Sequence, residues 1–333
     1  MPSILVLGAT GFIGAPLCQA LKRIHPEWNV TAQLRRTSTL SEKDLNTKLG
    51  TVDRVVQVSD WTDFDAIKSA SAEHDLVINA GNSFTADPVT AIIAGLQERK
   101  KQGKLAKLLH ISGGGNWLDF GMSGNFNPDS KVWNDDNVDD IKNIHKDMFN
   151  GQSDTAVLQA GAESGLDTYI VCPSVVYGGA AIDAPGLGVG YTLLTGNAKP
   201  LGYVPYVGEG TALLSTTHIV DLINFLVKIS EVAVASPKAE GTPYERYYML
   251  ETGRVAWKDL ATELARVLHQ EDPETFPYPA PKQVSFDEAG QGGVKHLIAG
   301  NTLFQGPRAQ RAGFKPEGKH ILEQLSVDLR GKF

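Results

Sequence analysis

The chain has 333 residues, of which 42% are hydrophobic and 21% are charged, enough to bury roughly three quarters of its unfolded surface in packed cores. Its longest apolar runs have the length of strands and fall far short of the roughly 20 residues of a bilayer span, so we expect no membrane protein. The net charge of −7 has the wrong sign for a partner such as nucleic acid or anionic lipid.

The sequence also predicts the cellular compartment and the absence of disulfide and metal sites. The first apolar run has no basic leader before it, so the default expectation is a cytoplasmic protein. Cys18 and Cys172 lie far apart in apolar surroundings, which is typical of buried thiols and not of a disulfide framework or a zinc cluster. The acidic residues at 135–140 lack the glycine and the terminal glutamate of a calcium loop, so we expect no bound metal.

Short apolar runs alternate with longer amphipathic ones in the first half of the chain. Runs such as 4–7 and 76–78 are apolar on both faces, as strands covered by helices on both sides must be. This rhythm predicts an α/β fold with a doubly wound parallel Rossmann sheet. We expect strands at 3–7, 29–34, 53–58, 75–79 and 107–112, and helices at 16–24, 64–70 and 87–99.

A long glycine-rich and aromatic stretch at 113–137 interrupts this rhythm, and such loops are usually lids or binding elements. The helical pattern then resumes from 139 to 165, with a break allowed at Gly151, and a strand follows at 168–171. Another helix is predicted at 253–269.

The composition shifts toward glycine, proline and aromatic residues after Tyr177, which indicates a smaller C-terminal substrate lobe. We therefore predict a Rossmann domain of residues 1–180, to which 211–230 return. Residues 181–210 and 231–333 are assigned to the substrate lobe.

A glycine motif, Gly8-Ala9-Thr10-Gly11-Phe12-Ile13-Gly14, lies between the first predicted strand and the helix after it. In this context bare backbone N–H groups and the helix N-terminus can hold a pyrophosphate. The motif predicts a dinucleotide site that uses Gly8, Thr10, Gly11, Phe12, Ile13 and Gly14.

The chain resembles the short-chain dehydrogenase/reductase superfamily at this motif, and specifically its extended or atypical branch of NAD(P)-dependent epimerase/dehydratase-like proteins. Similar pieces recur at Ser59-Asp60, 79–81, 110–113 and 172–178, and further on at 217–221 and in the Trp257 helix. The resemblance implies that Asp60 faces the adenine and that the loop at 173–178 flanks the nicotinamide. It also implies cofactor contacts from Asn79, Ala80, Gly81, Ser112, Pro173 and Val176.

The end of the second predicted strand carries Arg35-Arg36 where an NAD site would have an acidic residue for the ribose hydroxyl. Guanidinium groups bind a 2′-phosphate bidentately, which favours NADP (NADPH) as the cofactor. A solvated basic turn is the alternative interpretation.

The catalytic Tyr and Lys of the superfamily, four residues apart on the helix after the lid loop, are missing. No tyrosine precedes Tyr169, and the string from Tyr278 to Lys282 is interrupted by prolines that exclude a helix. Losing a general acid costs roughly 10²–10⁴ in rate.

Other side chains must therefore supply the catalytic groups. We expect His145 and Lys146 to replace the dyad, beside Ser112, with Lys142 and Asp154 as the other titratable residues of that helix. Two further interpretations stay open: His145 and Lys146 are merely solvated, or the substrate, such as an enone, quinone methide or iminium, needs no acid.

Residues on the substrate side are expected in the aromatic loop and after the later strands. Aromatic side chains of the loop would form an apolar wall against a flat substrate, or would simply pack within the loop. His218 equally fits the cap of the next helix. The predicted substrate residues are Gly114, Trp117, Trp133, Tyr177 and His218.

These features favour an NADP(H)-dependent oxidoreductase acting on a small, largely apolar or aromatic metabolite. One alternative is a redox sensor that binds NADP without catalysis, and another is a sugar-nucleotide epimerase or dehydratase. The sequence leaves the substrate, the reaction direction and the oligomeric state open.

Overall fold

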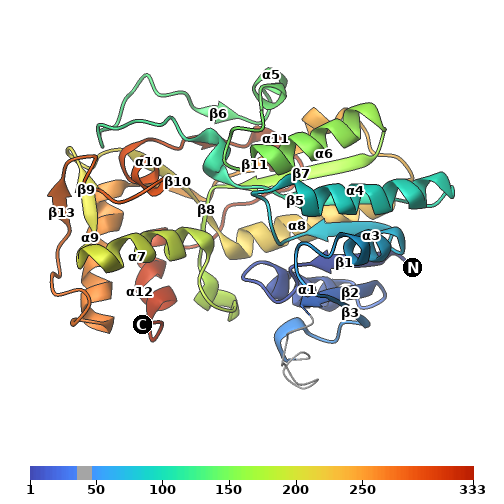
Figure 1. Ribbon diagram of the computed structural model, residues 1–333, viewed down its shortest axis with the longest axis horizontal. Coiled ribbons are helices and arrows are strands. Elements are labelled where there is room, and N and C mark those ends of the chain that lie inside the picture. The colour runs from blue at the N-terminus through green and yellow to red at the C-terminus, as the bar shows by residue number, and fades with distance from the viewer. Residues whose placement is uncertain (36–46) are drawn as a thin grey trace.

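A seven-stranded, wholly parallel sheet forms the centre of the larger domain in the computed structural model, which describes residues 1–35 and 47–333 (Figure 1). The strand order is β11-β7-β5-β4-β1-β2-β3, so the chain runs outward in both directions from β1. This confirms the predicted doubly wound Rossmann sheet. The strands are β1 (Ser3–Leu7), β2 (Asn29–Arg35), β3 (Arg54–Val58), β4 (Leu76–Asn79), β5 (Lys107–Ile111), β7 (Asp167–Pro173) and β11 (Tyr247–Leu250).

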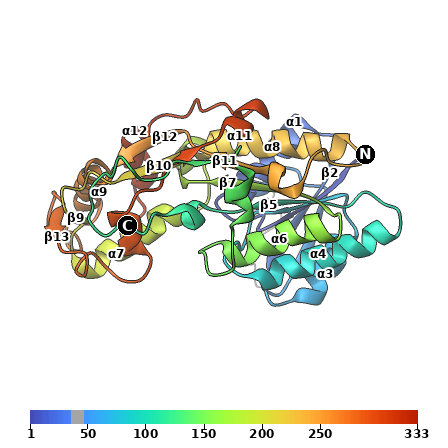
Figure 2. The ribbon, with the colours of Figure 1, turned by 90° about the horizontal axis from the view of Figure 1, so that it is seen from above.

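Helices cover both faces of this sheet (Figure 2). The alternation in β1 shows why: Ile4 and Val6 belong to the core under α1 and α8, whereas Leu5 and Leu7 belong to the core under the other helices. One face carries α1 (Gly14–Ile24) and α8 (Ile219–Ala235), and the other carries α3 (Phe64–Ala72), α4 (Ala86–Lys101) and α6 (Gly151–Glu163). Among the described helices, none has both the length and the apolarity of a bilayer span.

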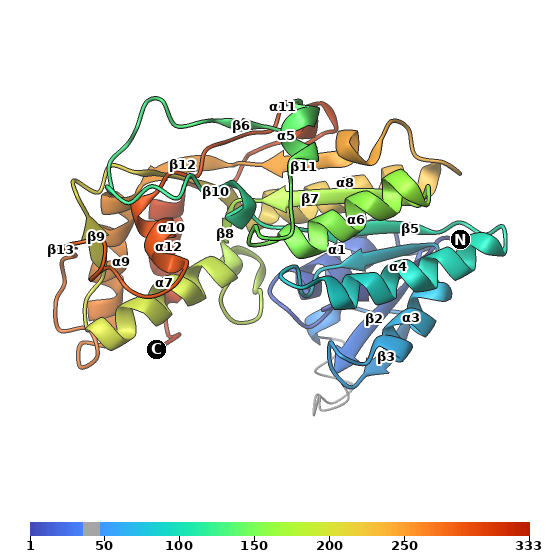
Figure 3. The ribbon, with the colours of Figure 1, turned by 45° about the horizontal axis from the view of Figure 1, so that its top comes forward.

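The smaller lobe lies beyond the carboxyl ends of the central strands (Figure 3). Its core contains Trp257, Tyr177 and Phe276, all fully buried. Its helices are α7 (Val189–Leu201), α9 (Trp257–Glu271), α10 (Val294–Ala299) and α12 (Ile321–Leu329), and its strands are β8 (Val175–Tyr177), β9 (Pro205–Val207), β10 (Leu213–His218), β12 (Gly253–Ala256) and β13 (Lys282–Val284).

The chain passes between the two domains more often than the sequence predicts. Residues 247–250, assigned above to the substrate lobe, form the edge strand β11 and pair with β7. The returning segment 211–230 divides between the domains: β10 pairs with β8 and β12 in the small sheet, while α8 packs on the central sheet. A separate two-stranded sheet is formed by β6 (Trp133–Asn134) and β14 (Phe304–Gln305). The helix α11 (Pro307–Arg311) follows β14.

The helix predicted from 139 to 165 is wrong in its middle. The structure has a short α5 (Val138–Lys142) and then α6, with turns between them over residues 143–150. Asn143 ends α5, and Asn150 takes the N-cap position of α6. This break decides which side chains reach the carboxyl edge of the sheet.

Candidate functional site

The glycine loop after β1 builds an open cradle from backbone alone. Gly8 has φ +74°, and a Cβ there would lie 2.8–2.9 Å from the backbone of Ala80 and Gly81. A Cβ at Gly14 would lie 2.1 Å from the Gly8 carbonyl oxygen, so only glycine allows α1 to start this close to β1. No side chain caps α1 at Ile13. Ala15 donates its N–H to the Gly11 carbonyl and Pro16 has none, so a ligand here would meet the backbone N–H groups that precede them in the glycine loop.

This cradle opens into a cleft of about 760 Å³ that runs along the carboxyl ends of the central strands into the smaller lobe. Most predicted cofactor residues line it, together with the predicted substrate residue Gly114. The lining residues among them are Gly8, Thr10, Gly11, Phe12, Ile13, Arg35, Ala80, Gly81, Ser112, Pro173 and Val176. The residues present therefore fit a dinucleotide whose phosphates lie at the start of α1.

Three predicted cofactor residues act from outside the lining. Gly14 serves the packing described above, and Asp60 accepts hydrogen bonds from the backbone and side chain of Thr62. Asn79 is buried and uses Oδ1 to accept from the Gly81 backbone N–H at 3.2 Å. Arg36 falls outside the described residues.

Two of the lining residues that were not predicted contact predicted cofactor residues. The Trp61 ring lies directly over Gly81, because a Cβ on that glycine would come within 2.0 Å of the ring. Gln33 accepts from the Gly8 backbone N–H at 3.0 Å and so ties β2 to the glycine loop. Trp61 directly follows Asp60 in the sequence, which was the available signal for an aromatic side chain in this part of the cleft.

The polar part of the cleft lies where β5 ends. Ser112 lines the cleft and donates to Asp154 Oδ2 at 2.7 Å. Asn150 also lines it, from the N-cap of α6, and its side-chain oxygen lies next to Gly113 and Gly115. Asp154 is fully buried one helical turn further along α6.

Comparison with known proteins agrees with this geometry. Residues 4–100 match the model of the NAD dependent epimerase/dehydratase family. The predicted resemblance to the extended short-chain dehydrogenase/reductase superfamily is confirmed. Over nearly its full length the chain is similar to "Oxidase ucsJ" from an Acremonium species, with 26% identity over 97% of this chain and 95% of that protein.

Solved structures show the same fold. The Bordetella bronchiseptica enzyme WbmH, solved in complex with NAD+, has a TM-score of 0.64 at 14% identity and covers 100% of both chains. UDP-glucose 4-epimerase from Thermotoga maritima, solved with UDP-glucose, has a TM-score of 0.63 at 15% identity over 98% of this chain and 97% of that one. The dTDP-glucose 4,6-dehydratase from Bacillus anthracis, solved with NAD, has a TM-score of 0.62 at 14% identity over 99% of this chain and 96% of that one.

Asn150 and Asp154 have the same four-residue spacing as the superfamily's Tyr and Lys, on the helix where the resemblance places that dyad. Neither side chain can act as a tyrosine does: an amide does not give up a proton, and Asp154 carries no positive charge to lower the pKa of a neighbour. The sequence showed this spacing, but its meaning depends on where α6 begins.

The structure does not place His145 or Lys146 in the cleft. Both are exposed and lie in the non-helical segment between α5 and α6, and the His145 side chain is 60% exposed beside Asp147. The expectation that they replace the dyad places both on a helix, whereas residues 143–150 form turns. Because that helix is interrupted, their side chains extend into solvent.

Four of the predicted substrate residues also lie outside the cleft lining. Trp117 is fully buried and donates from its indole N–H to the Tyr247 hydroxyl at 3.1 Å. Trp133 belongs to β6 and carries Lys131 over its ring. Tyr177 is buried in the small lobe, and His218 caps α8 by accepting from the Val220 N–H. The alternative interpretations, loop packing and helix capping, therefore describe these residues.

The substrate side of the cleft is formed by other apolar side chains. They come from the loops after β4 and β5, the segments before α6 and α7, and helices α7 and α10: Phe84, Leu118, Phe149, Leu187, Val189, Leu193, Val294 and Leu297. Of the described residues that line the cleft, Arg35 is the single charged one. Within the described chain, no group of three potential metal ligands comes together.

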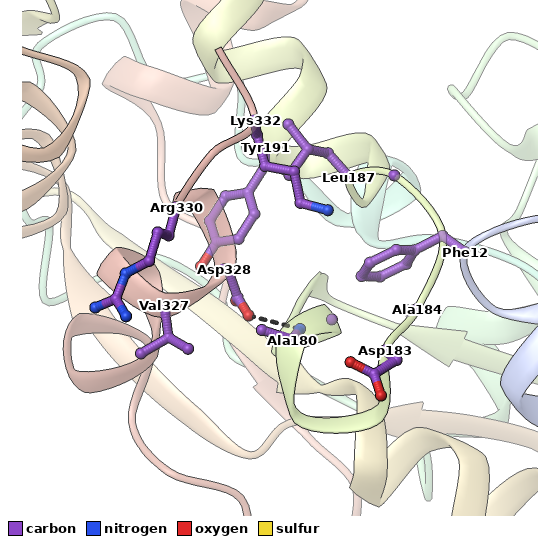
Figure 4. A pocket seen from close by; sticks show the side chains of 12 residues that line it. Phe12, Ala180, Asp183, Ala184, Leu187, Tyr191, Val327, Asp328, Arg330 and Lys332 are labelled. Atoms are coloured by element: carbon purple, nitrogen blue, oxygen red, sulfur yellow. Dashed lines mark hydrogen bonds between the residues drawn. The ribbon is translucent and has the colours of Figure 1, made fainter. Parts of the chain in front are cut away.

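A second pocket of about 260 Å³ adjoins the cleft on the other side of Phe12 (Figure 4). The Phe12 ring packs against Gly179 and Gly188, where a Cβ would lie 2.6 Å and 3.0 Å from the ring. Asp328 closes the pocket floor by accepting from the Ala180 N–H at 3.0 Å. Through Phe12, the glycine loop thus contacts the segment that precedes α7.

Proposed function

We propose that the protein is an NADP(H)-dependent oxidoreductase that acts on a small, largely apolar or aromatic metabolite. The observation that carries the proposal is the continuity of the cleft, which joins the glycine cradle and Arg35 to an apolar wall from the smaller lobe. A dinucleotide bound with its phosphates at α1 would direct its nicotinamide toward Ser112 and this wall.

Arg35 supports NADP over NAD. It is exposed at the carboxyl end of β2 and lines the cleft, with no described acidic side chain in the lining to bind a ribose hydroxyl. A guanidinium at this position suits a 2′-phosphate. NADP would supply hydride transfer, while the chain would bind, orient and exclude water.

The apolar wall supports the substrate class. Phe84, Phe149 and Leu193 are 39–50% exposed although they are large and apolar, and all three line the cleft. Exposed apolar side chains gathered around a concave site are typical of a surface that a ligand covers. A highly polar sugar nucleotide would match this wall poorly.

Calorimetry with NADPH and NADH tests the cofactor assignment. NADPH should bind more tightly, and Arg35→Ala should remove about 1.5–3 kcal/mol of that preference. Arg54→Ala is the matched control, since Arg54 is an exposed arginine on β3 that pairs with Glu73 outside the cleft lining. Equal affinities for the two cofactors in the wild type would reject the assignment.

A cofactor-binding sensor without catalysis is the second candidate. It is favoured by one observation: among the described lining residues, none is a tyrosine, lysine or histidine that would act as the acid. A sugar-nucleotide epimerase or dehydratase has less support, because the superfamily's chemistry on such substrates uses the missing Tyr and Lys. A screen of alcohols, ketones, enones and imines for NADPH formation or consumption separates a sensor from an enzyme.

A further inference from the structure

Ser112 faces the cleft with its oxygen lone pairs and not with its hydrogen. Its hydroxyl donates to Asp154 Oδ2 at 2.7 Å, and both side chains are buried, with 5% and 0% exposure. A hydroxyl that donates to a carboxylate makes a charge-assisted bond that a neutral ligand does not replace. What remains on the cleft side is an acceptor.

Asp154 is held as an acceptor by two more donors. The same Oδ2 accepts from Asn116 Nδ2 at 2.9 Å and from the Tyr247 hydroxyl at 3.2 Å. Burial raises the pKa of Tyr247 well above its ordinary value and raises that of Cys172 to about 12, so both neighbours stay protonated. Three donors on one oxygen suit an ionised carboxylate.

His110 completes the surroundings of Asp154 from β5. Its Nδ1 accepts from Asn79 Nδ2 at 3.1 Å, because Asn79 already uses Oδ1 to accept from the Gly81 N–H. The ring hydrogen therefore lies on Nε2, which is 3.2 Å from its hydrogen-bond partner Ser153 Oγ and 3.4 Å from Asp154 Oδ1. The three donors on Oδ2 hold this carboxylate as an acceptor, which keeps Ser112 in its donor role.

Ser174 repeats the pattern on the neighbouring strand. It lines the cleft, and its hydroxyl lies 2.8 Å from Thr217 Oγ1. Thr217 gives its own hydrogen to the Leu250 carbonyl, so Ser174 must be the donor of the pair. The two buried serines at this end of the cleft thus both present lone pairs.

We propose that this end of the cleft binds a substrate through an X–H donor, an alcohol or an amine, and that Asp154 makes Ser112 the acceptor of the proton when the substrate is oxidised. The proposal rests on the proposed function and names its substrate class. The O–H or N–H bond breaks as its proton passes to Ser112 Oγ, and the hydrogen of Ser112 passes to Asp154 Oδ2. The C–H bond on the same carbon breaks as hydride leaves to the oxidised nicotinamide, and a C=O or C=N bond forms.

Matched ligands test, without any reaction, whether this end of the cleft accepts a hydrogen bond from the substrate. Naphthylethanol, naphthylethylamine and acetonaphthone share one carbon skeleton and differ in whether they offer a donor. Each ligand is titrated calorimetrically into the full chain, first without cofactor and then with the chain saturated with tetrahydro-NADP. This reduced analogue cannot give up hydride. The alcohol or the amine should bind about tenfold or more tightly than the ketone, and which of the two binds more tightly identifies the group.

Variants show whether Ser112 causes the preference for the alcohol or the amine over the ketone. Ser112→Ala should reduce the preference to within about threefold, and Ser112→Thr, which keeps the hydroxyl, should retain it. Asp154→Asn should weaken the preference as well; because it removes a buried carboxylate, its melting temperature is measured alongside. The wild-type comparison and the serine pair remain decisive even if that variant does not fold.

A ketone that binds as tightly as the alcohol and the amine would overturn this inference. The cleft would then donate a hydrogen bond to the ketone oxygen. The buried Thr302 hydroxyl could be this donor, since it lines the cleft and has no partner among the described residues. That result, with NADPH still bound, would leave the proposed function standing. Failure of the chain to bind NADPH at all would instead reject the proposed function.

Discussion

The two ends of the cleft follow the superfamily to different degrees. At the cofactor end, Gly8, Gly11 and Gly14 have the spacing and geometry of a phosphate cradle. At the reaction end, Asn150 and Asp154 stand at the spacing of the expected Tyr and Lys. The first site depends on backbone geometry and is part of the fold, whereas the second depends on side chains that change without disturbing α6.

Closing the cradle should have the largest effect. Gly11→Val is expected to abolish NADPH binding while the fold is retained, since its side chain would enter the space of the phosphates beside the Gly8 carbonyl oxygen. Gly196→Val is the control, because this exposed glycine on α7 has no atom within 4 Å of its added Cβ. Unchanged NADPH affinity in Gly11→Val would mean that the loop holds no dinucleotide.

Removing the acceptor pair at the reaction end should cost about 10²–10⁴ in the rate of alcohol or amine oxidation, measured at saturating NADP+. Ser112→Ala and Asp154→Asn should each lose this much in kcat, and the double variant should lose no more, because the two groups act as a unit. Ser112→Thr should recover most of the rate. Additive losses would show that the two residues act separately.

The control for that experiment is another buried carboxylate. Asp135 accepts from the backbone N–H groups of Met249, Arg308 and Ala309, and it lies outside the cleft lining. Asp135→Asn should leave the oxidation rate of the folded protein within about threefold of the wild type. A loss as large as that of Asp154→Asn would assign both effects to general destabilisation.

Asp135 should itself affect stability through pH. Burial raises its pKa from 3.8 to about 6 in the folded chain. Its stabilising contribution is therefore complete below the unfolded pKa and is lost as pH rises toward 6, by about 3 kcal/mol. Urea unfolding at about pH 4 and about pH 7 should show this loss in the wild type relative to Asp135→Asn, and parallel behaviour of the two proteins would contradict it.

The smallest effect is expected from the residues first assigned to catalysis. His145→Ala and Lys146→Ala should each change the rate by less than about twofold, because both side chains are exposed outside the cleft lining. The same assay that reports on Ser112 measures them. A hundredfold loss in either variant would mean that the segment between α5 and α6 closes over the substrate.

The fold was largely predictable because the sequence patterns that indicate its strands and helices are local. Strands such as β1 and β4 are continuous apolar runs, and the helices between them have amphipathic spacing. β11 was missed because its place beside β7 is a long-range contact, formed after the rhythm of the first half has ended. Its four residues carry no sign of which sheet they join.

The candidate site was predictable where it depends on sequence motifs and not where it depends on helix boundaries. The glycine loop is a motif, and five of the six residues predicted from it, all but Gly14, line one cleft. Asp154 could be assigned only once α6 was known to begin after Asn150. Trp117 was expected in a lid, but the turn at 114–117 directs it inward against Tyr247.

A crystal structure of the chain with NADP+ bound would test the central claim most directly. We expect the pyrophosphate against the backbone N–H groups of Phe12 and Ile13, the 2′-phosphate on the Arg35 guanidinium, and the nicotinamide between Ser112 and Val176. A cofactor bound elsewhere, or a nicotinamide that lies away from Ser112, would contradict the account.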